Sequence, residues 1–201
     1  YGATLLAVSF IFVFEAHIAK TDALLCGFSA LCLGALAHLR GGGSRKSGVL
    51  FWGALGCAVM IKGPILPTLL ILCLLALLIW ERKAAWLKPL GFWLGPLLFL
   101  AIVLPWSVMI WRETGGTFFT EAIGNDLTPK LQGAQEKHPG PPGYYLGTIW
   151  LAFWPACLFL LPGLVFGIQA ARAKTGAGFD TPVSRSARLL LCWSVPFFIL
   201  M

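Results

Sequence analysis

The chain has 201 residues, of which 58% are hydrophobic and only 11% are charged, and its formal net charge is +7. A soluble domain carries roughly 25% charged residues, and it could not bury this much apolar surface because surface area falls too slowly with size. The composition therefore excludes an ordinary soluble domain and predicts an all-α polytopic transmembrane helix bundle. Because the chain begins at Tyr1 and ends inside an apolar run, we expect it to be an internal fragment of a longer protein.

About seven apolar segments are candidates for membrane-spanning helices, since a span needs about 20 apolar residues. In chain order they are Tyr1–Phe14, Asp22–Leu39, Gly48–Ile61, Pro64–Trp80, Trp86–Trp111, Tyr144–Ile168 and Leu189–Met201. The third is short, and only Lys62-Gly63-Pro64 separates it from the fourth. These two segments form either a tight hairpin or a short helix whose end is buried in protein. Pro64 suits the start of a helix, whereas Pro105 predicts a kink late in a long span.

Charged residues alternate between the two sets of loops. Ten of the fifteen basic residues fall in one set, with only Glu81 and Asp180 as acids: Arg40, Arg45, Lys46, Arg82, Lys83, Lys88, Arg172, Lys174, Arg185 and Arg188. Loops on the cytoplasmic side carry an excess of Lys and Arg, so this set predicts the cytoplasmic face. The positive net charge is therefore a topology signal, and no nucleic-acid motif accompanies it, so we expect no nucleic-acid partner.

The other face holds three polar segments: Glu15–Asp22, the Lys62–Pro64 junction and the stretch 112–143. Loops longer than about 12–15 residues are usually functional or disordered. Within 112–143 and its approach, Trp111, Phe118, Phe119, Ile123 and Leu127 follow near-helical spacing. We therefore expect 112–143 to be an outer loop that contains an amphipathic helix along the interface.

Three charged residues on this outer face have two interpretations each. Asp22 opens an apolar helix, where it is either a carboxylate favoured in the first helical turn or a functional group at membrane depth. Lys20 either contacts a lipid phosphate or extends its ammonium to the interface. Lys62 is either an interfacial turn lysine or a point charge that holds a phosphate.

The remaining candidates give weaker signals. His138 shares the outer loop with Glu121, Asp126 and Glu136, but zinc sites normally draw three or four ligands. Tyr144 and Tyr145 begin a span, as residues of an interfacial aromatic belt do. The six cysteines all lie in apolar stretches without a CxxC pair, which is typical of packing residues. No nucleotide-binding motif is present.

Several blocks, in order, resemble bacterial PMT-like glycosyltransferases, the group that contains the lipid A aminoarabinose transferases and the protein mannosyltransferases. Ala19-Lys20-Thr21-Asp22-Ala23-Leu24-Leu25 resembles their A-R-T-D-x-L-L segment, and Lys62-Gly63-Pro64 matches their K-G-P junction. The third set spans most of the remaining chain and comprises Leu104-Pro105-Trp106, Thr114-Gly115-Gly116, Phe118-Phe119, Asn125, His138, Pro141-Pro142, Tyr144-Tyr145 and Trp154-Pro155. Any one block is weak evidence, but the ordered set is specific.

The resemblance implies a GT-C fold, of which residues 1–201 are one part, in a multi-pass protein of the bacterial inner membrane. It also implies transfer of a hexosyl or pentosyl group from a polyprenyl-phosphate donor, at the periplasmic face, to a lipid A-like or protein acceptor. The family's main catalytic carboxylate and a C-terminal part would lie outside this chain. Two departures are Lys20, where the family usually has Arg, and Gly143, where an aromatic residue is usual.

By the same resemblance, Asp22 is a supporting carboxylate, and Lys20 and Lys62 bind the donor phosphate. A second set, formed by Glu121, Asn125, Tyr144 and Tyr145, belongs to the loop that meets acceptor and donor. His138 matches a zinc-ligand position beside the donor phosphate, so a divalent metal, Zn²⁺ or Mg²⁺, is the one cofactor expected. The alternatives are a transporter or flippase of a polyprenyl-linked lipid, and a non-catalytic membrane scaffold. Transporters usually show internal repeats; none is evident here, which favours the enzyme.

Overall fold

The computed structural model describes residues 2–18, 21–121, 144–172 and 181–200, and every regular element among them is a helix. The elements are α1 (Gly2–Ala7), α2 (Phe10–His17), α3 (Asp22–Arg40), α4 (Arg45–Lys62), α5 (Ile65–Glu81), η1 (Ala85–Gly91), α6 (Leu94–Thr114), α7 (Thr117–Glu121), α9 (Tyr144–Ala152), η3 (Ala156–Phe159), α10 (Leu160–Arg172) and α11 (Pro182–Leu200). The predicted all-α class is therefore confirmed for these residues.

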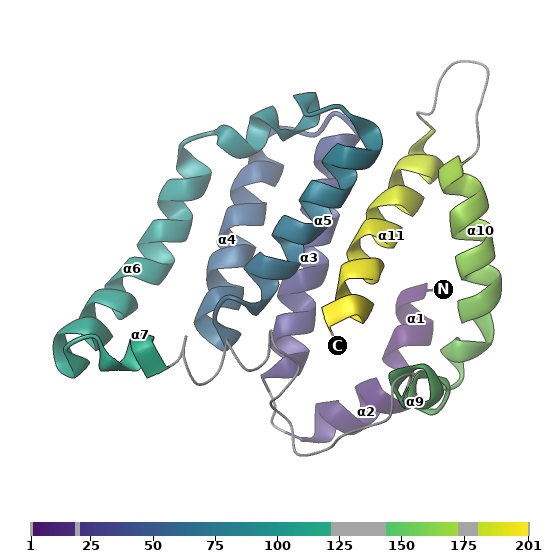
Figure 1. The fold of residues 1–201 in the computed structure, drawn as a ribbon, viewed down its shortest axis with the longest axis horizontal. Helices are drawn as coiled ribbons and strands as arrows, with labels where there is room; N and C mark the ends of the chain where they lie inside the picture. Colours follow the sequence, from purple (N-terminus) through teal and green to yellow (C-terminus); the bar gives the residue numbers. More distant parts are fainter. Residues whose placement is uncertain (1, 19–20, 122–143, 173–180, 201) are drawn as a thin grey trace.

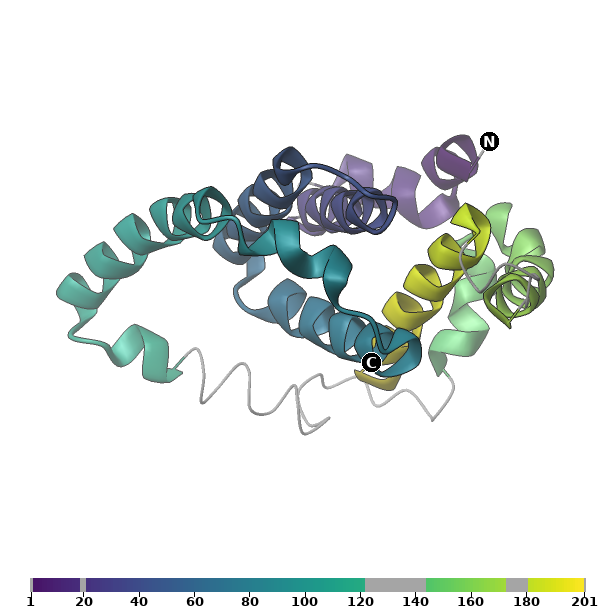
Figure 2. The same cartoon turned by 90° about the horizontal axis from the view of Figure 1, so that it is seen from above.

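The long helices stand side by side, and α2 and α9 lie across them at one end (Figure 1). Helix α4 packs against both α3 and α6, while α5 packs against α11 (Figure 2). The core between α3, α4, α5 and α11 consists of closely packed apolar side chains such as Leu36, Ala58, Leu70 and Leu77. All six cysteines are free thiols and four are buried, which agrees with a packing role.

The first turn of α4, which begins at Arg45, packs directly against the backbone of η1. A Cβ atom built on Gly48 would lie 2.5 Å from the carbonyl oxygen of Pro89, so only glycine fits this approach. The indole Nε1 of Trp52, one turn further along, donates a hydrogen bond of 2.8 Å to the carbonyl oxygen of Leu90. A small residue and an anchored tryptophan therefore fix η1 on the side of α4.

Three of the predicted spans are broken in the structure. The expected span Trp86–Trp111 is divided at Phe92, whose backbone is extended, into η1 and α6. The expected span Tyr1–Phe14 is divided at Ser9, which is extended and whose hydroxyl donates to the carbonyl oxygen of Leu6; such side-chain bonds compete with the helix ladder. The expected span Tyr144–Ile168 is interrupted between α9 and η3, where Pro155 lacks the N–H that a continuous helix needs. Hydropathy alone could not reveal the breaks at Ser9 and Pro155, because the residues that flank them are apolar.

By length and composition, α3 and α6 are the helices among the described residues that could cross a membrane, and α5 and Ala156–Arg172 are shorter apolar helices. The count of about seven spans is therefore not confirmed. Large apolar side chains face outward on several helices: Ile79 of α5 is 76% exposed, Leu151 of α9 72% and Met109 of α6 68%. A helix bundle that leaves such side chains uncovered is suited to a lipid environment.

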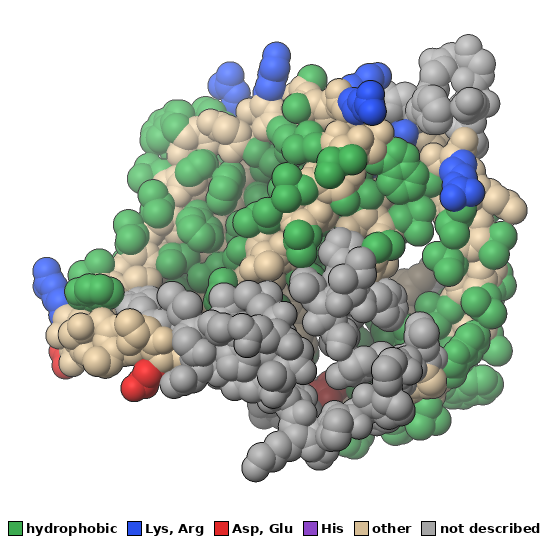
Figure 3. All heavy atoms as spheres, in the orientation of Figure 1, with side chains coloured by type: hydrophobic (Ala, Val, Ile, Leu, Met, Phe, Trp, Pro, Cys, Tyr) green, Lys and Arg blue, Asp and Glu red, His purple; other side chains and the backbone are tan. Residues whose placement is uncertain are grey.

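Basic and acidic side chains lie at opposite ends of the bundle, as the alternation of charge between successive loops predicts. Most Lys and Arg side chains in view gather at the end where α3 ends and α4 begins, whereas Asp and Glu side chains appear at the opposite end (Figure 3). Glu113 lies in the last turn of α6 and Glu121 at the end of α7. The belt between the two ends is largely apolar (Figure 3). We refer to the basic end and the acidic end of the bundle below.

Candidate functional site

Asp22 is the first residue of α3 and lies at the acidic end of the bundle. Helix α3 begins here because the preceding segment is polar and the following nineteen-residue helix is mostly apolar. The carboxylate lies in the first turn, where a negative charge interacts favourably with the helix dipole. The preceding residue, Thr21, makes no side-chain capping hydrogen bond.

Lys62 is the last residue of α4, and the two residues after it form the turn into α5. Gly63 has φ 65° and ψ −144°, a backbone conformation that essentially only glycine adopts. Pro64 follows, and its carbonyl oxygen accepts the N–H of Thr68 in the first turn of α5. The K-G-P motif therefore forms a tight hairpin between the antiparallel helices α4 and α5. Of the two predicted alternatives, a hairpin or a short helix with a buried end, the structure has the hairpin.

The hairpin brings Lys62 onto Asp22, although forty positions separate them in the chain. The ammonium Nζ of Lys62 donates to Oδ1 of Asp22. Both side chains remain accessible, at 41% exposed for Lys62 and 48% for Asp22. Two residues that the sequence assigned to one site, from two separate motifs, thus lie in contact at the acidic end.

The ion pair is chemically suited to an anionic ligand. The ammonium of Lys62 has three N–H donors, and one of them bonds to Oδ1 of Asp22. The bond orients the ammonium, and the side chain still has an exposed surface that a ligand can contact. Exposed ion pairs contribute about 0–1 kcal/mol. A phosphate group arriving from the membrane can therefore engage Lys62 without a large cost for rearranging the pair.

The structure does not bring the other predicted site residues into contact with the Asp22–Lys62 pair within the described residues. Glu121 is exposed at the end of α7, and no ion pair joins it to Asp22 or Lys62 among the described residues. Tyr144 and Tyr145 begin α9, as the sequence predicts for the start of a helix, but their side chains are not described. Lys20, Asn125 and His138 lie outside the described residues.

The expected amphipathic helix of the outer loop is represented by α7 alone within the described residues. Helix α6 continues to Thr114 and so includes the first residues of the predicted loop, and it runs through Pro105 without interruption. The rest of the loop, 122–143, lies outside the described residues.

A divalent metal remains a prediction. Within the described ranges, no group of three or more His, Cys, Asp or Glu side chains is arranged to hold a metal ion. Of the two histidines in those ranges, His17 bonds to the carbonyl oxygen of Val13 and His38 to the hydroxyl of Ser47. The expected ligand, His138, is outside them.

Sequence reasoning missed a buried charge cluster at the basic end. Glu81, at the end of α5, lies between Arg40 of α3 and Arg188 of α11, and both arginines are 5% exposed. Nε of Arg188 lies 3.1 Å from Oε1 of Glu81. The signal in the sequence was Glu81 itself, because it is one of two acidic residues among ten basic ones and a lone acid in a basic loop is a candidate partner.

No family model matches the chain, and no curated protein matches it significantly. Among solved structures, the crystal structure of ArnT from Cupriavidus metallidurans bound to undecaprenyl phosphate superposes with a TM-score of 0.77 at 22% sequence identity. The match covers 99% of this chain and 35% of that protein. The chain therefore has the helical fold of about a third of ArnT, which confirms at the level of fold the resemblance carried by the sequence motifs.

Proposed function

We propose that this chain is the part of a membrane glycosyltransferase that binds the phosphate of a polyprenyl-phosphate sugar donor, at the acidic end of the bundle. The observation that carries the proposal is the contact between Lys62 and Asp22, which joins the two motif residues into one accessible site. The likeness to ArnT, which was solved with undecaprenyl phosphate, supports the proposal from an independent direction.

The chemistry of transfer needs a cation at this place. As the bond between the sugar C1 and the phosphate oxygen breaks, its electron pair passes to the oxygen, and C1 forms a new bond to the acceptor hydroxyl oxygen. Charge therefore builds on the lipid phosphate, where the ammonium of Lys62 is placed to stabilise it. Lys20, two residues before Asp22, would add a second positive charge on the same side.

The acceptor hydroxyl must lose its proton to a base positioned within hydrogen-bond reach. Asp22 already accepts from Lys62, so its role in this proposal is to hold the ammonium in position and not to take the proton. The base would then be supplied by a part of the protein outside this chain. This division of roles agrees with a chain that spans about a third of the length of ArnT.

We further propose that the acceptor is a lipid A-like lipid or a protein at the periplasmic face of the bacterial inner membrane. The support for this sidedness is the charge distribution, because the basic end suits the cytoplasm and leaves the Asp22–Lys62 site on the other side. A contribution to acceptor or donor contacts from Glu121, Asn125, Tyr144 and Tyr145, and a metal at His138, belong to the same proposal.

The test is a transfer assay with the full-length protein in membranes and a labelled polyprenyl-phosphate sugar. Lys62→Ala should lower the transfer rate sharply, since removal of one donor to a developing anion costs about 10²–10³ in rate. Lys83→Ala is the matched control, because Lys83 is an exposed lysine two residues after the end of α5, at the basic end. Equal transfer rates in the two variants would exclude Lys62 from the site.

The same assay separates transfer from transport. A transporter or flippase would bind the labelled donor, and would lose binding in Lys62→Ala, while transferring no sugar to any lipid or protein. Retained donor binding with no transfer by the unaltered protein, with acceptor lipids and proteins supplied, would support the transport function and overturn the enzymatic one.

A further inference from the structure

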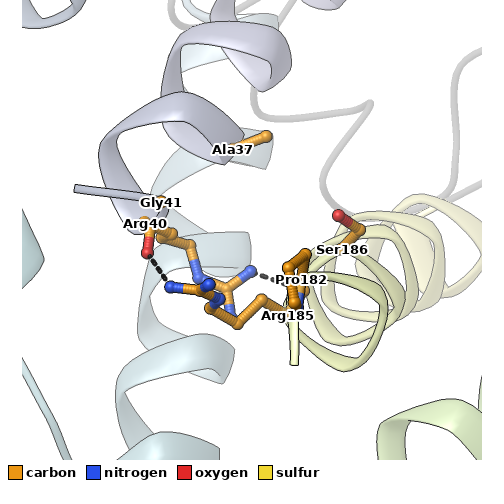
Figure 4. Close-up of a pocket in the computed structure, with 6 residues that line it drawn as sticks. All are labelled: Ala37, Arg40, Gly41, Pro182, Arg185 and Ser186. Carbon is orange, nitrogen blue, oxygen red and sulfur yellow. Dashed lines mark hydrogen bonds between the residues drawn. The ribbon is translucent and has the colours of Figure 1, made fainter. Parts of the chain in front are cut away.

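The basic end of the bundle holds two kinds of basic side chain. Arg40 of α3 and Arg185 of α11 donate hydrogen bonds to each other's carbonyl oxygens, so both guanidinium groups are engaged within the protein (Figure 4). In contrast, the side chains of three other basic residues are exposed: Arg45 and Lys46, in the first turn of α4, and Lys88, in η1. We call these three side chains the α4–η1 patch.

The packing of η1 on α4 brings the members of the patch to neighbouring positions. Pro89, the residue after Lys88, packs against Gly48 of α4. Arg45 lies three positions before Gly48 and so on the same face of α4. Its Cζ is 4.9 Å from the centroid of the Phe92 ring, at the end of η1. The contact between the two helices therefore places exposed cations from both of them on one surface.

The carboxylate nearest in kind to a partner for this patch is already paired. Glu81 is the one acidic residue at the basic end within the described ranges, and it bonds to Arg40 and Arg188. The first turn of α4 contains no acidic residue, and the ring of Phe92 does not neutralise the charge of Arg45. Cations in a first turn oppose the helix dipole, so the stability of α4 does not explain why they are there.

The surface beside the patch is apolar. Trp93 follows η1 and is 64% exposed, and Leu94 and Leu97, at the start of α6, are 40% and 51% exposed. Tryptophan favours the boundary between lipid headgroups and hydrocarbon. A cationic patch that borders an exposed tryptophan and exposed leucines matches a molecule with an anionic head and apolar tails, whereas a soluble anion would make no use of the apolar border.

We propose that the α4–η1 patch binds the phosphate of an anionic phospholipid headgroup. Basic side chains beside a membrane helix attract anionic headgroups, and a guanidinium matches two phosphate oxygens with paired N–H donors. The phosphate contacts Arg45 and Lys88, and the acyl chains run along Leu94 and Leu97 of α6. The proposal rests on the membrane placement of the bundle but not on transfer activity, and the patch lies at the opposite end from the Asp22–Lys62 site.

The test measures thermal unfolding of the full-length, lipid-depleted protein in detergent while a lipid is titrated. Phosphatidylglycerol should raise the unfolding midpoint, and zwitterionic phosphatidylcholine should raise it less. The double variant Arg45→Gln with Lys88→Gln should weaken the apparent affinity for phosphatidylglycerol by about tenfold, because two attractions to the headgroup are lost. The matched control is Lys83→Gln with Arg172→Gln, which removes the same two charges from exposed positions after α5 and at the end of α10, outside the patch. It should titrate like the unaltered protein.

A second variant separates lipid binding from a folding defect. Lys46→Glu reverses an exposed charge in the first turn of α4, where a negative charge suits the helix dipole. Its unfolding midpoint without lipid should therefore not fall, while the effect of phosphatidylglycerol should weaken. An unchanged phosphatidylglycerol titration in Lys46→Glu would overturn the proposal, as would equal titrations of the two double variants or equal effects of the two lipids.

Sodium phosphate at matched ionic strength is the remaining arm of the test. It should shift the midpoint less than phosphatidylglycerol does, because it lacks the acyl chains that contact α6. A shift as large as that of phosphatidylglycerol would overturn the proposal and assign the patch to soluble phosphate. No sugar donor is present in these titrations, so their outcome is independent of whether the protein transfers sugar.

Discussion

At the basic end of the bundle, Glu81 lies between two arginines that are each 5% exposed, and the three residues come from α5, α3 and α11. At the acidic end, Asp22 of α3 meets Lys62 of α4, and both side chains are about half exposed. Both contacts join charged residues far apart in the sequence, and both tie helices together at their ends. Burial is the property that distinguishes them.

Burial changes what each contact can do. Charges removed from water depend on their partners, since breaking a buried pair leaves an uncompensated charge. Charges that keep their hydration can exchange partners at little cost. We infer that the Arg40–Glu81–Arg188 cluster holds helices together, whereas the Asp22–Lys62 pair is available to a ligand.

The largest effect is expected at Glu81. Glu81→Gln removes the carboxylate that compensates Arg40 and Arg188, so it should destabilise the protein by about 3–5 kcal/mol. The measurement is the thermal unfolding midpoint of the full-length protein in detergent, followed by tryptophan fluorescence. An unfolding midpoint within a few degrees of the unaltered protein would show that the cluster is not structural.

An exchange of charges at the acidic end should separate activity from stability. The double variant Asp22→Lys with Lys62→Asp preserves an exposed ion pair, so its unfolding midpoint should stay close to that of the unaltered protein. Its transfer rate should fall by about 10²–10³, because the ammonium moves from the position that we propose for binding the donor phosphate. Normal turnover of labelled polyprenyl-phosphate sugar would contradict a specific role for Lys62, because an ammonium at position 22 would then support transfer equally well.

The sequence predicts the helical fold and the charge distribution, but not where each helix begins and ends. The helical class followed from the apolar lengths, and the segregation of charge followed from the loop charges. The family resemblance suggested roles for Asp22 and Lys62, but the ion pair between them was not predicted. Hydropathy placed the start of the last span at Leu189, because Arg185 and Arg188 suggested a solvated loop. The structure begins α11 at Pro182 and buries Arg188 against Glu81.

The same limit explains the broken spans. A window of apolar residues reports how much surface must avoid water, but not whether the backbone turns within it. Ser9 and Pro155 each interrupt a segment whose average hydropathy suffices for a span. Glu81 stood out in the sequence as a lone acid in a basic loop, but its contact with Arg40 could not be predicted, because it joins positions forty-one apart with no periodic pattern between them.

A smaller effect is expected from two matched glycine substitutions. Gly48→Ala, at the basic end, places a Cβ atom 2.5 Å from the carbonyl oxygen of Pro89 and should destabilise the protein by about 1–3 kcal/mol. Gly27→Ala, towards the acidic end of α3, meets no atom within 4 Å and should be neutral or slightly stabilising, since alanine favours helix by up to about 1 kcal/mol. Equal unfolding midpoints in the two variants would contradict the close contact of α4 with η1.

The smallest effect is expected from Asp22→Asn. Because the pair with Lys62 is exposed, its loss should change the free energy of unfolding by less than about 1 kcal/mol. The difference should vanish in 1 M salt, where charges are screened beyond about 3 Å, whereas the deficit of Glu81→Gln should persist because buried pairs are screened much less. Unfolding midpoints of both variants at low and high salt provide the measurement. A salt-resistant loss of stability in Asp22→Asn would place the acidic pair in the same structural class as the buried cluster, and Lys62 would then be held too firmly to exchange its partner for a phosphate.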